Sequence, residues 1–410
     1  MTELPRLTSA EAAARLGIRL ETLYAYVSRG RITRHRDSDG STFDPLEVER
    51  LATERRRDPA AIRRASPAGT PLMILDTDLA LIEDGRLYLR GQDIAGLTEL
   101  PYEEVASRLW QAEAASPGAG LFRADEAAVA TARTVLAAMP AETRPIDLIM
   151  VAARVFGQAD PLRSELSPGR VIRAAGALLA GLIAVLPDQA ERSGAAEPRP
   201  RRRLAAELWP KLTARRPTGP RVAALNAALV ALFDHDLAVS TLAARAAASA
   251  RADPYGVVSA GLAALDSALH GTASVDAHRL LAAIQAGTSV DRALAETLRG
   301  RTGIPGFGHR LYAGQDARAT VLLDRLAGVP GTARTLELAG SVADEVTRRT
   351  GQSPNVDFAL ATLVLAFGMA AEAGEVIFAC ARIGGWIAHA LDEYQRPPLR
   401  LRPTGRYIGP

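Results

Sequence analysis

The stretch Gly303-Ile-Pro-Gly-Phe-Gly-His-Arg310 lies between two long runs of helix-forming residues in this 410-residue sequence. Glycine lets a backbone approach a ligand closely and point N–H groups at it, so the bend from Gly303 to Gly308 is a candidate turn for a nucleotide or phosphate. The glycine spacing does not match the dinucleotide fingerprint, and no strand is expected before it. A Rossmann fold is therefore not predicted.

The sequence around this stretch is typical of an all-α protein. Apolar residues make up 48% of the chain and aromatic residues only 5%, and much of the apolar part is alanine and leucine. These two residues favour helices because they lose little side-chain entropy there. From Leu204 onward the pattern indicates long helices broken at glycine and proline. A chain of this length is also long enough for more than one domain.

Three of the six histidines lie in distinctive local sequences. His235 follows Asp234 in an Asp-His-Asp-Leu segment, His270 precedes Gly271, and His309 follows the glycine-rich bend. A lone histidine in a helical protein is more often a surface or core residue, but glycines beside two of these three favour a functional role. The histidine spacings form no metal-binding motif, so no metal is expected.

Asp357 is a candidate general base. It lies in Pro354-Asn-Val-Asp-Phe358, just before an apolar run from 359 to 367. A partly buried carboxylate at the mouth of an apolar helix has a raised proton affinity, which suits a base. The alternative is an aspartate that only caps the helix.

Three arginines, Arg318, Arg382 and Arg402, are candidate clamps for a substrate carboxylate. A guanidinium can grip a carboxylate through two parallel hydrogen bonds. In a chain this rich in arginine, any one of them taken alone is more commonly a surface residue.

Taken together, these motifs resemble the citrate synthase family. The matching segments, in chain order, are His-Asp-Leu at 235–237, Leu-His-Gly at 269–271, Gly-Phe-Gly-His-Arg-Leu-Tyr at 306–312, Asn-Val-Asp at 355–357 and Ala-Arg-Ile-Gly-Gly-Trp-Ile-Ala-His at 381–389. The resemblance runs from about Leu75 to the C-terminus. It implies the all-α citrate synthase fold over 72–410, with a small subdomain at about 272–365 that closes over coenzyme A.

The resemblance also implies roles for these residues. Asp357 would take a proton from the acyl-CoA, His270 would stabilise the enol, and His309 would polarise the ketone of oxaloacetate. The expected oxaloacetate-binding residues are His235, Arg318, Arg382 and Arg402, and the expected coenzyme A-binding residues are Gly306, Phe307, Gly308 and Asn355. Arg402 would serve the neighbouring subunit, so a homodimer is implied. No permanently bound cofactor is implied, and acetyl-CoA or propionyl-CoA would be the co-substrate.

Some positions depart from the family pattern. The chain has Val239 where asparagine is usual, Gly271-Thr-Ala-Ser274 where Gly-Gly-Ala-Asn is usual, and Ala313 where a basic residue is common. The usual Asp-Pro-Arg is Asp316-Ala-Arg318. These departures leave the acyl group open. Citrate synthase with acetyl-CoA is expected, and 2-methylcitrate synthase with propionyl-CoA is the alternative, since one methylene is worth only about 1–3 kcal/mol of discrimination.

Residues 1–55 resemble the winged helix-turn-helix of excisionase and MerR-like proteins. Thr8 and Glu11 form a capping box, Gly17 breaks the first helix, and Asp39-Gly40 predicts a hairpin. Segment 1–66 holds 13 arginines and 10 acidic residues, which accounts for the net charge of +3 of the whole chain. DNA binding is one reading, in which the protein is a regulator whose synthase body senses a metabolite. The other is an appendage that docks on the body through Leu20, Leu23 and Val27.

The remaining features concern linkers and compartment. Residues 56–71 and 188–203 are predicted to be linker-like, and the alternation from Asp76 to Arg90 predicts a β-hairpin. Cys380 is the single cysteine, so an intramolecular disulfide is impossible. With no apolar stretch of a signal peptide and no run of spanning length, a cytoplasmic protein without a membrane anchor is expected.

Overall fold

A computed structural model describes residues 5–37, 40–57, 74–111, 120–189, 203–267, 271–300, 303–312, 314–403, 406–407 and 409. The described residues between 5 and 57 form a unit that we call the head, and those from 74 onward form the body. The predicted linker at 56–71 lies almost entirely outside the described residues, as does most of the segment from 188 to 203. His270 also lies outside them.

The head begins with the predicted capping box. It consists of β1 (Leu7–Thr8), α1 (Ser9–Leu16), α2 (Leu20–Ser28), β2 (Arg34–Asp37), β3 (Gly40–Phe43) and α3 (Pro45–Arg57). The Thr8 hydroxyl accepts from the Glu11 N–H at 3.3 Å, and the Glu11 carboxylate accepts from the Thr8 N–H at 2.8 Å. Gly17 ends α1 with a φ of 61°, which glycine adopts at little cost. The strands form an antiparallel sheet in the order β1-β3-β2.

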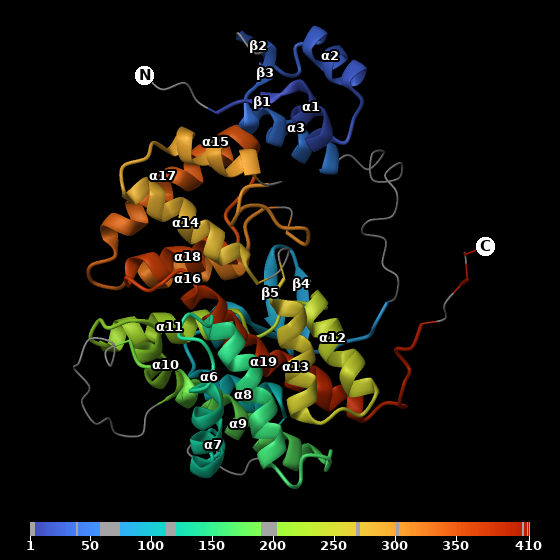
Figure 1. The fold of residues 1–410 in the computed structure, drawn as a ribbon, viewed down its shortest axis with the longest axis vertical. Helices are drawn as coiled ribbons and strands as arrows, with labels where there is room; N and C mark the ends of the chain where they lie inside the picture. Colours follow the sequence, from blue (N-terminus) through green and yellow to red (C-terminus); the bar gives the residue numbers. More distant parts are fainter. Residues whose placement is uncertain are drawn as a thin grey trace.

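The head has its own apolar core and faces the body with α3. Leu23 and Phe43 are fully buried in that core, and Val27 packs against it. Leu20 points to solvent with 44% of its surface exposed. Helix α3 lies on α15 (Val290–Gly300) and α17 (Ala333–Thr350), whereas α2 and the β2–β3 hairpin lie on the far side (Figure 1). The prediction that Leu20, Leu23 and Val27 dock the head is therefore wrong, because α3 makes the contact.

The body opens with the hairpin that the sequence predicts. β4 (Ala80–Glu83) and β5 (Arg86–Leu89) pair antiparallel around Asp84-Gly85, and β6 (Gln92–Asp93) completes a small sheet. Asp84 and Gly85 have φ of 50° and 75°, as a tight hairpin turn requires. The rest of the described body is helical, which confirms the all-helical prediction for this part of the chain.

The large part of the body packs around α19 (Ala373–Tyr394). The other helices of this part are α5 (Ile94–Leu97), α6 (Tyr102–Leu109), α7 (Glu126–Leu136), α8 (Pro145–Ala159), α9 (Pro168–Val185), α10 (Leu204–Leu212), α11 (Gly219–Ala231), α12 (Val239–Ser249) and α13 (Pro254–Leu265). Trp386 at the centre of α19 is fully buried against Gly261 of α13, where an added Cβ would lie 2.5 Å from the indole. Glycine there permits the close packing of α13 on α19.

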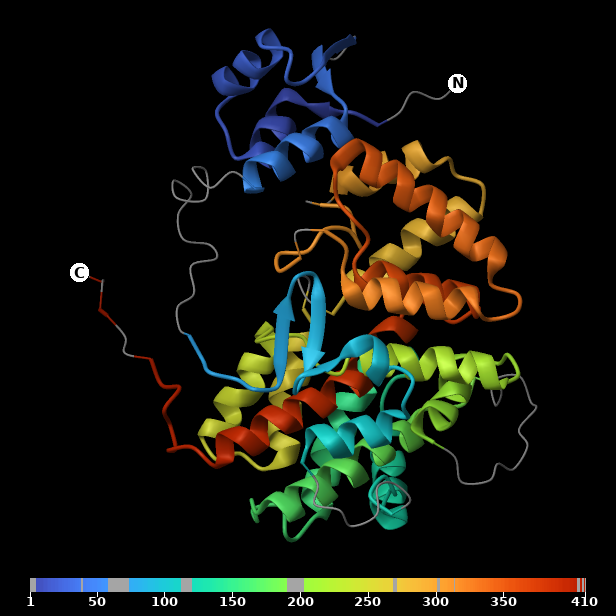
Figure 2. The same ribbon diagram turned by 180° about the vertical axis from the view of Figure 1, so that it is seen from behind.

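A second apolar core lies between the large part and the head. It is built by α14 (Ala273–Gln285), α15, α17 and one face of α18 (Val356–Ala366). The other face of α18 belongs to the large core, together with Leu322 and Leu326 of α16 (Ala317–Ala327). Figure 2 shows the same layers from behind, with α16 and α18 between the large part and the helices α14, α15 and α17. The beginning of α18 thus lies where the two cores meet.

One helix, Pro168–Val185, is long and apolar enough to cross a membrane by length and composition alone. Because 67% of its apolar window is buried inside the protein, it has the character of a core helix.

Candidate active site

The first turn of α18 carries Asp357. Asn355 caps this helix, because its Oδ1 accepts the Asp357 N–H at 3.0 Å, so the alternative that Asp357 is only a capping residue is wrong. The Oδ1 of Asp357 is buried and accepts no hydrogen bond within the described residues. Burial raises the pKa of Asp357 to about 6, although Arg318 and Arg382 oppose the shift. A carboxylate with a raised pKa and a free oxygen has the properties of a general base.

A second carboxylate, Asp316, interacts with Asp357 but has its pKa shifted in the opposite direction. It caps α16 and pairs with Arg318 through two hydrogen bonds, of 3.0 Å from Nε and 2.7 Å from Nη2. Its Oδ2 also accepts the Val356 N–H at 3.0 Å, which ties α16 to α18. Burial alone would raise the pKa of Asp316, but the Arg318 guanidinium outweighs it and holds the pKa below its usual value. Asp316 therefore stays ionised while Asp357 exchanges protons near neutral pH.

Three aromatic side chains, His235, His309 and Tyr312, cluster near these groups. The rings of His235 and His309 meet edge-on with centroids 4.9 Å apart, and His235 Nε2 lies 3.1 Å from the Tyr312 hydroxyl. Burial, followed by the charges of Arg318 and His309, lowers the pKa of His235 well below its usual range. Burial and the Arg318 charge lower the pKa of His309 to about 4. Both imidazoles are therefore neutral at pH 7.

The hydrogen bonding of His309 fixes which ring nitrogen carries the proton. Its Nδ1 accepts the Leu311 N–H at 3.0 Å, so Nδ1 is unprotonated and the proton of the neutral ring is on Nε2. A neutral Nε2–H donor can polarise a carbonyl oxygen without carrying a net charge.

Arg382 supplies a second buried guanidinium. Only 1% of its surface is exposed, its Nε donates to the Leu232 carbonyl at 2.8 Å, and it lies 4.8 Å from the Phe378 ring centroid. Burial, together with repulsion from Arg318, lowers the pKa of Arg382 to about 10, although Asp234 opposes this. Two buried cations in one site suit a small ligand with two carboxylates.

Glycines in α19 bring the His235 segment to the site. A Cβ on Gly384 would lie 2.2 Å from the Phe233 ring, and one on Gly385 would lie 2.3 Å from the Phe233 carbonyl. The segment that ends in His235 can therefore lie directly on α19, beside Arg382. His389, one turn further along α19, contacts Asp234 at 3.2 Å, with both side chains fully buried.

Backbone hydrogen bonds join the glycine-rich turn to itself and to the segment before α18. Gly306 and Gly308 have φ of 81° and 73°, which explains the glycines. The N–H of Phe307 bonds to Ile304 at 3.1 Å, and that of Gly308 to Ser353 at 2.9 Å. The expectation that these N–H groups point at a ligand is therefore wrong for Phe307 and Gly308.

The side chains at this turn are also used structurally. The Phe307 ring packs on Phe358 with centroids 4.7 Å apart and belongs to the second core. Asn355 donates from Nδ2 to the Gly308 carbonyl at 2.9 Å and from its backbone to the Gly306 carbonyl at 2.8 Å. Asn355 thus holds the turn against α18, in addition to capping that helix.

The structure does not place two of the predicted site residues, Arg402 and His270, in this cluster. Arg402 is exposed and follows α19 in a C-terminal segment that extends away from the body in both views (Figures 1 and 2). His270 lies outside the described residues, directly before Gly271, whose N–H bonds to the Leu265 carbonyl at 2.9 Å. The sequence reading missed Tyr312 and the pairing role of Asp316, although both occur in motifs that it quoted.

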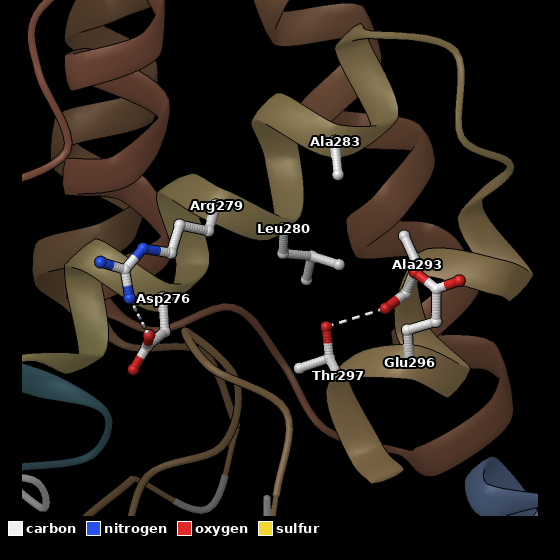
Figure 3. Close-up of a pocket in the computed structure, with 7 residues that line it drawn as sticks. All are labelled: Asp276, Arg279, Leu280, Ala283, Ala293, Glu296 and Thr297. Carbon is white, nitrogen blue, oxygen red and sulfur yellow. Dashed lines mark hydrogen bonds and ion pairs between the residues drawn. The ribbon is translucent and has the colours of Figure 1, made fainter. Parts of the chain in front are cut away.

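A pocket of about 340 Å³ lies apart from this cluster, between α14 and α15 (Figure 3). It is lined by Asp276, Arg279, Leu280, Ala283, Ala293, Glu296 and Thr297, none of which is a predicted site residue. Arg279 pairs with Asp276 at 3.3 Å at one end of it. Among the described residues, no group of histidine, cysteine, aspartate or glutamate side chains could hold a metal ion.

A buried base, a neutral imidazole donor and two buried guanidiniums at the junction of two helical cores define an enzyme site for a small carboxylic acid. Residues 69–404 match the family model described as citrate synthase, C-terminal domain. The chain therefore belongs to the citrate synthase family, whose members are acyltransferases that carry out a Claisen condensation, as the sequence predicted. Members of this family need no permanent cofactor and take an acyl-CoA as co-substrate.

Curated relatives carry two different names. Citrate synthase 2 of Bacillus subtilis is 29% identical over 351 residues, which are 81% of this chain and 92% of that protein. The 2-methylcitrate synthase of Mycobacterium tuberculosis is 28% identical over 333 residues, which are 78% of this chain and 82% of that protein.

Solved structures share the fold. Citrate synthase of Thermotoga maritima superposes with a TM-score of 0.67 at 24% identity, covering 84% of this chain and 96% of that one. The Thermoplasma acidophilum citrate synthase, in a ternary complex with carboxymethyl coenzyme A and oxaloacetate, gives a TM-score of 0.68 at 22% identity, covering 83% and 95%.

Proposed function

We propose that this protein condenses acetyl-CoA with oxaloacetate to give citrate and free coenzyme A. The observation that carries the proposal is Asp357, whose buried Oδ1 accepts no hydrogen bond from any described residue and whose pKa is raised to about 6 by burial. Such a group is largely ionised at pH 7 but is a stronger base than an ordinary aspartate.

The reaction then follows in three steps. Asp357 takes a proton from the methyl carbon of the acyl group, and the electron pair moves onto the thioester oxygen, where His270 donates a hydrogen bond. The enol carbon attacks the ketone carbon of oxaloacetate, and the ketone oxygen becomes a hydroxyl by taking the proton from His309 Nε2. Asp357 gives up the proton it took from the methyl carbon, and His309 Nε2 is reprotonated, so both groups return to their starting states. Water then hydrolyses the citryl thioester and releases the thiol of coenzyme A, which makes the sequence irreversible.

The oxaloacetate carboxylates are held by the cationic side of the site. Arg318 is locked by its two bonds to Asp316, so its position is set before the ligand arrives. Arg382 and His235 complete the pocket from the α19 side, and Arg402 reaches the site of a neighbouring subunit in a homodimer. The turn at Gly306, Phe307 and Gly308, with Asn355 behind it, forms the wall for coenzyme A through its surface rather than through the bonded N–H groups.

The same chemistry can use either an acetyl or a propionyl group. Propionyl-CoA is the alternative, as the name of the Mycobacterium tuberculosis relative suggests. Free thiol release from acetyl-CoA and from propionyl-CoA, each with oxaloacetate, decides between them through the ratio of kcat/KM. A ratio favouring acetyl-CoA supports citrate synthesis, a ratio favouring propionyl-CoA supports 2-methylcitrate synthesis, and no release with either contradicts the proposal.

We also propose that the head is a winged helix-turn-helix module that binds duplex DNA. Helix α2 and the β2–β3 hairpin lie on the side of the head away from the body (Figure 1), and Arg29 at the end of α2 and Arg36 of β2 are exposed. Tyr24 of α2 is 39% exposed, and the Arg34 guanidinium lies 6.0 Å from its ring centroid. An aromatic residue among arginines suits a helix in the major groove with phosphates at its edges. Two heads in a homodimer would read an inverted repeat.

Mobility shift of a duplex by the whole protein at low salt tests the second proposal. Arg29→Gln with Arg36→Gln should weaken the shift, whereas Arg348→Gln, an exposed arginine of α17 on the body, should leave it unchanged. If the unsubstituted protein shifts no duplex even at low salt, the head has no role in DNA binding.

A further inference from the structure

The head contributes a residue to the second apolar core, which is otherwise built by α14, α15, α17 and α18. Leu46 of α3 is 2% exposed and belongs to the second core, beside Leu294 and Leu298 of α15 and Val342 of α17. At the edge of this contact, Arg349 of α17 bonds to Asp44 of the head at 2.5 Å. An interface with a buried leucine and an ion pair fixes the orientation of α3.

A buried polar contact lies next to this apolar one. The side-chain amide of Gln352 donates from Nε2 to Thr53 Oγ1 at 2.7 Å and to Glu49 Oε1 at 3.2 Å. All three side chains are less than a tenth exposed. The Thr53 hydroxyl donates to the Glu49 carbonyl at 2.9 Å, so its oxygen is left to accept from Gln352. Removing one partner would leave a buried polar group without a hydrogen bond, which is unfavourable, so this contact is specific.

Gln352 also lies against the glycine-rich turn. Its Oε1 is the nearest atom to the position of a Cβ on Gly308, at 3.2 Å. The next residue, Ser353, accepts the Gly308 N–H, and Asn355 bonds to both Gly306 and Gly308. Segment 352–355 and turn 306–308 are thus paired along their length, with an isolated bridge between Phe307 and Pro354.

The two ends of this pairing face different partners. At the outer end, Gln352 is held by α3 of the head. Because the pairing is antiparallel, this outer end also carries Gly308, which leads into His309, whereas Asn355 at the inner end leads into Asp357. A displacement of α3 would therefore move the wall of the acyl-CoA site and the groups that carry the chemistry.

We infer that Glu49 and Thr53 of the head are positioning residues for the acyl-CoA site, acting through Gln352 on turn 306–308. The inference rests on the proposed function of that turn. It means that the head contributes to acyl-CoA binding by the body. Since coupling between two sites is reciprocal, acyl-CoA bound at the turn also stabilises α3.

Matched substitutions on α3 test the inference in the full-length protein. Thr53→Val is nearly isosteric and removes the acceptor, whereas Thr53→Ser keeps it. We expect Thr53→Val to raise the KM for the acyl-CoA about 3- to 10-fold, with a smaller change in kcat, and Thr53→Ser to stay within about twofold of the unsubstituted protein. Asp44→Asn is the control, because it removes the ion pair with Arg349 in the same interface without touching Gln352.

Hydrogen exchange gives a second readout that needs no turnover. In Thr53→Val, amides of 303–312 should exchange faster than in the unsubstituted protein and in Asp44→Asn. Unchanged acyl-CoA KM and unchanged exchange in Thr53→Val would overturn the inference, and so would an equal rise of KM in Asp44→Asn. If the unsubstituted protein releases no thiol, the proposed function fails separately, and the exchange of 303–312 still decides whether α3 holds the turn.

Discussion

The site of the body and the outer face of the head both present arginines, but in opposite environments. Arg318 and Arg382 are 3% and 1% exposed and are held by Asp316 and by the Leu232 carbonyl, whereas Arg29 and Arg36 of the head face solvent. A buried, fixed guanidinium can recognise one small carboxylate in one orientation. Exposed guanidiniums suit a polyanion, whose attraction is weak per contact and depends on salt. This contrast supports the two proposals, that the body carries out the chemistry and that the head binds a polyanion.

The largest expected effect concerns the buried side of this comparison. Asp357→Asn keeps the shape of the side chain but removes the base, so turnover should fall by about two orders of magnitude or more while oxaloacetate still binds. His270→Ala should behave similarly, because it removes a donor to the enol. Turnover by thiol release and oxaloacetate binding by calorimetry measure this.

The matched control is Asp291→Asn on α15, an exposed carboxylate that pairs with Arg349 outside the site. Its turnover should be that of the unsubstituted protein. Near-normal turnover of Asp357→Asn would show that Asp357 is not the base. The contrast between a catalytic body and a binding head would then lose its main support.

The next largest effect concerns Arg402, an exposed arginine of the body. If it completes the neighbouring subunit's site, Arg402→Ala should raise the KM for oxaloacetate on the order of 10-fold without dissociating the dimer. Mixing Arg402→Ala with Asp357→Asn subunits should restore activity, because one site of each hybrid dimer then holds both residues. Arg406→Ala, also exposed on the tail, is the control. Hybrid dimers without any restored activity would place Arg402 outside the site.

The body's residues were predictable because each lies in a contiguous motif. His235, His309, Arg318 and Asp357 were singled out from their neighbours in the sequence, and the structure brings them within electrostatic reach of one another. The sequence could not show that Asn355 caps α18 or that the Phe307 and Gly308 N–H groups are already bonded. Such partners are set by the packing of α18 against the turn, which no local pattern reports.

The docking of the head was predicted on the wrong helix for a related reason. Leu20, Leu23 and Val27 recur at helical spacing, but spacing does not say which core an apolar face joins. Leu23 lies in the core of the head, Leu20 faces solvent, and Leu46 of α3 joins the core of the body. Helix α3 contributes residues to both cores, and periodicity alone cannot show which core each of its apolar residues joins.

A smaller effect is expected for the exposed arginines of the head. Each phosphate contact removed from the head should lower the slope of log affinity against log salt by about 0.9. Arg29→Gln and Arg36→Gln should therefore each weaken binding to a duplex a few-fold at moderate salt and reduce this slope, and the double variant should reduce it by about twice as much. Fluorescence anisotropy at four or more salt concentrations gives the slopes. Weaker binding with an unchanged slope would mean that these arginines do not contact phosphates.

The smallest expected effect is on stability, and its sign follows from the burial of Asp357. The pKa of Asp357 is about 6 in the folded protein, above the usual aspartate value of 3.8, so the folded state prefers the protonated form. The stability that this group contributes is therefore fully present below about pH 4 and is lost as pH rises through about 6. Asp357→Asn is neutral at every pH, so at pH 8 its Tm should exceed that of the unsubstituted protein by about 1–3 °C, and the difference should vanish below pH 4. Arg36→Gln, an exposed change, should leave Tm unaltered at both pH values. A Tm of Asp357→Asn that is lower at pH 8 would mean that the ionised carboxylate is stabilised in the folded protein, and the buried base would then be an ordinary aspartate.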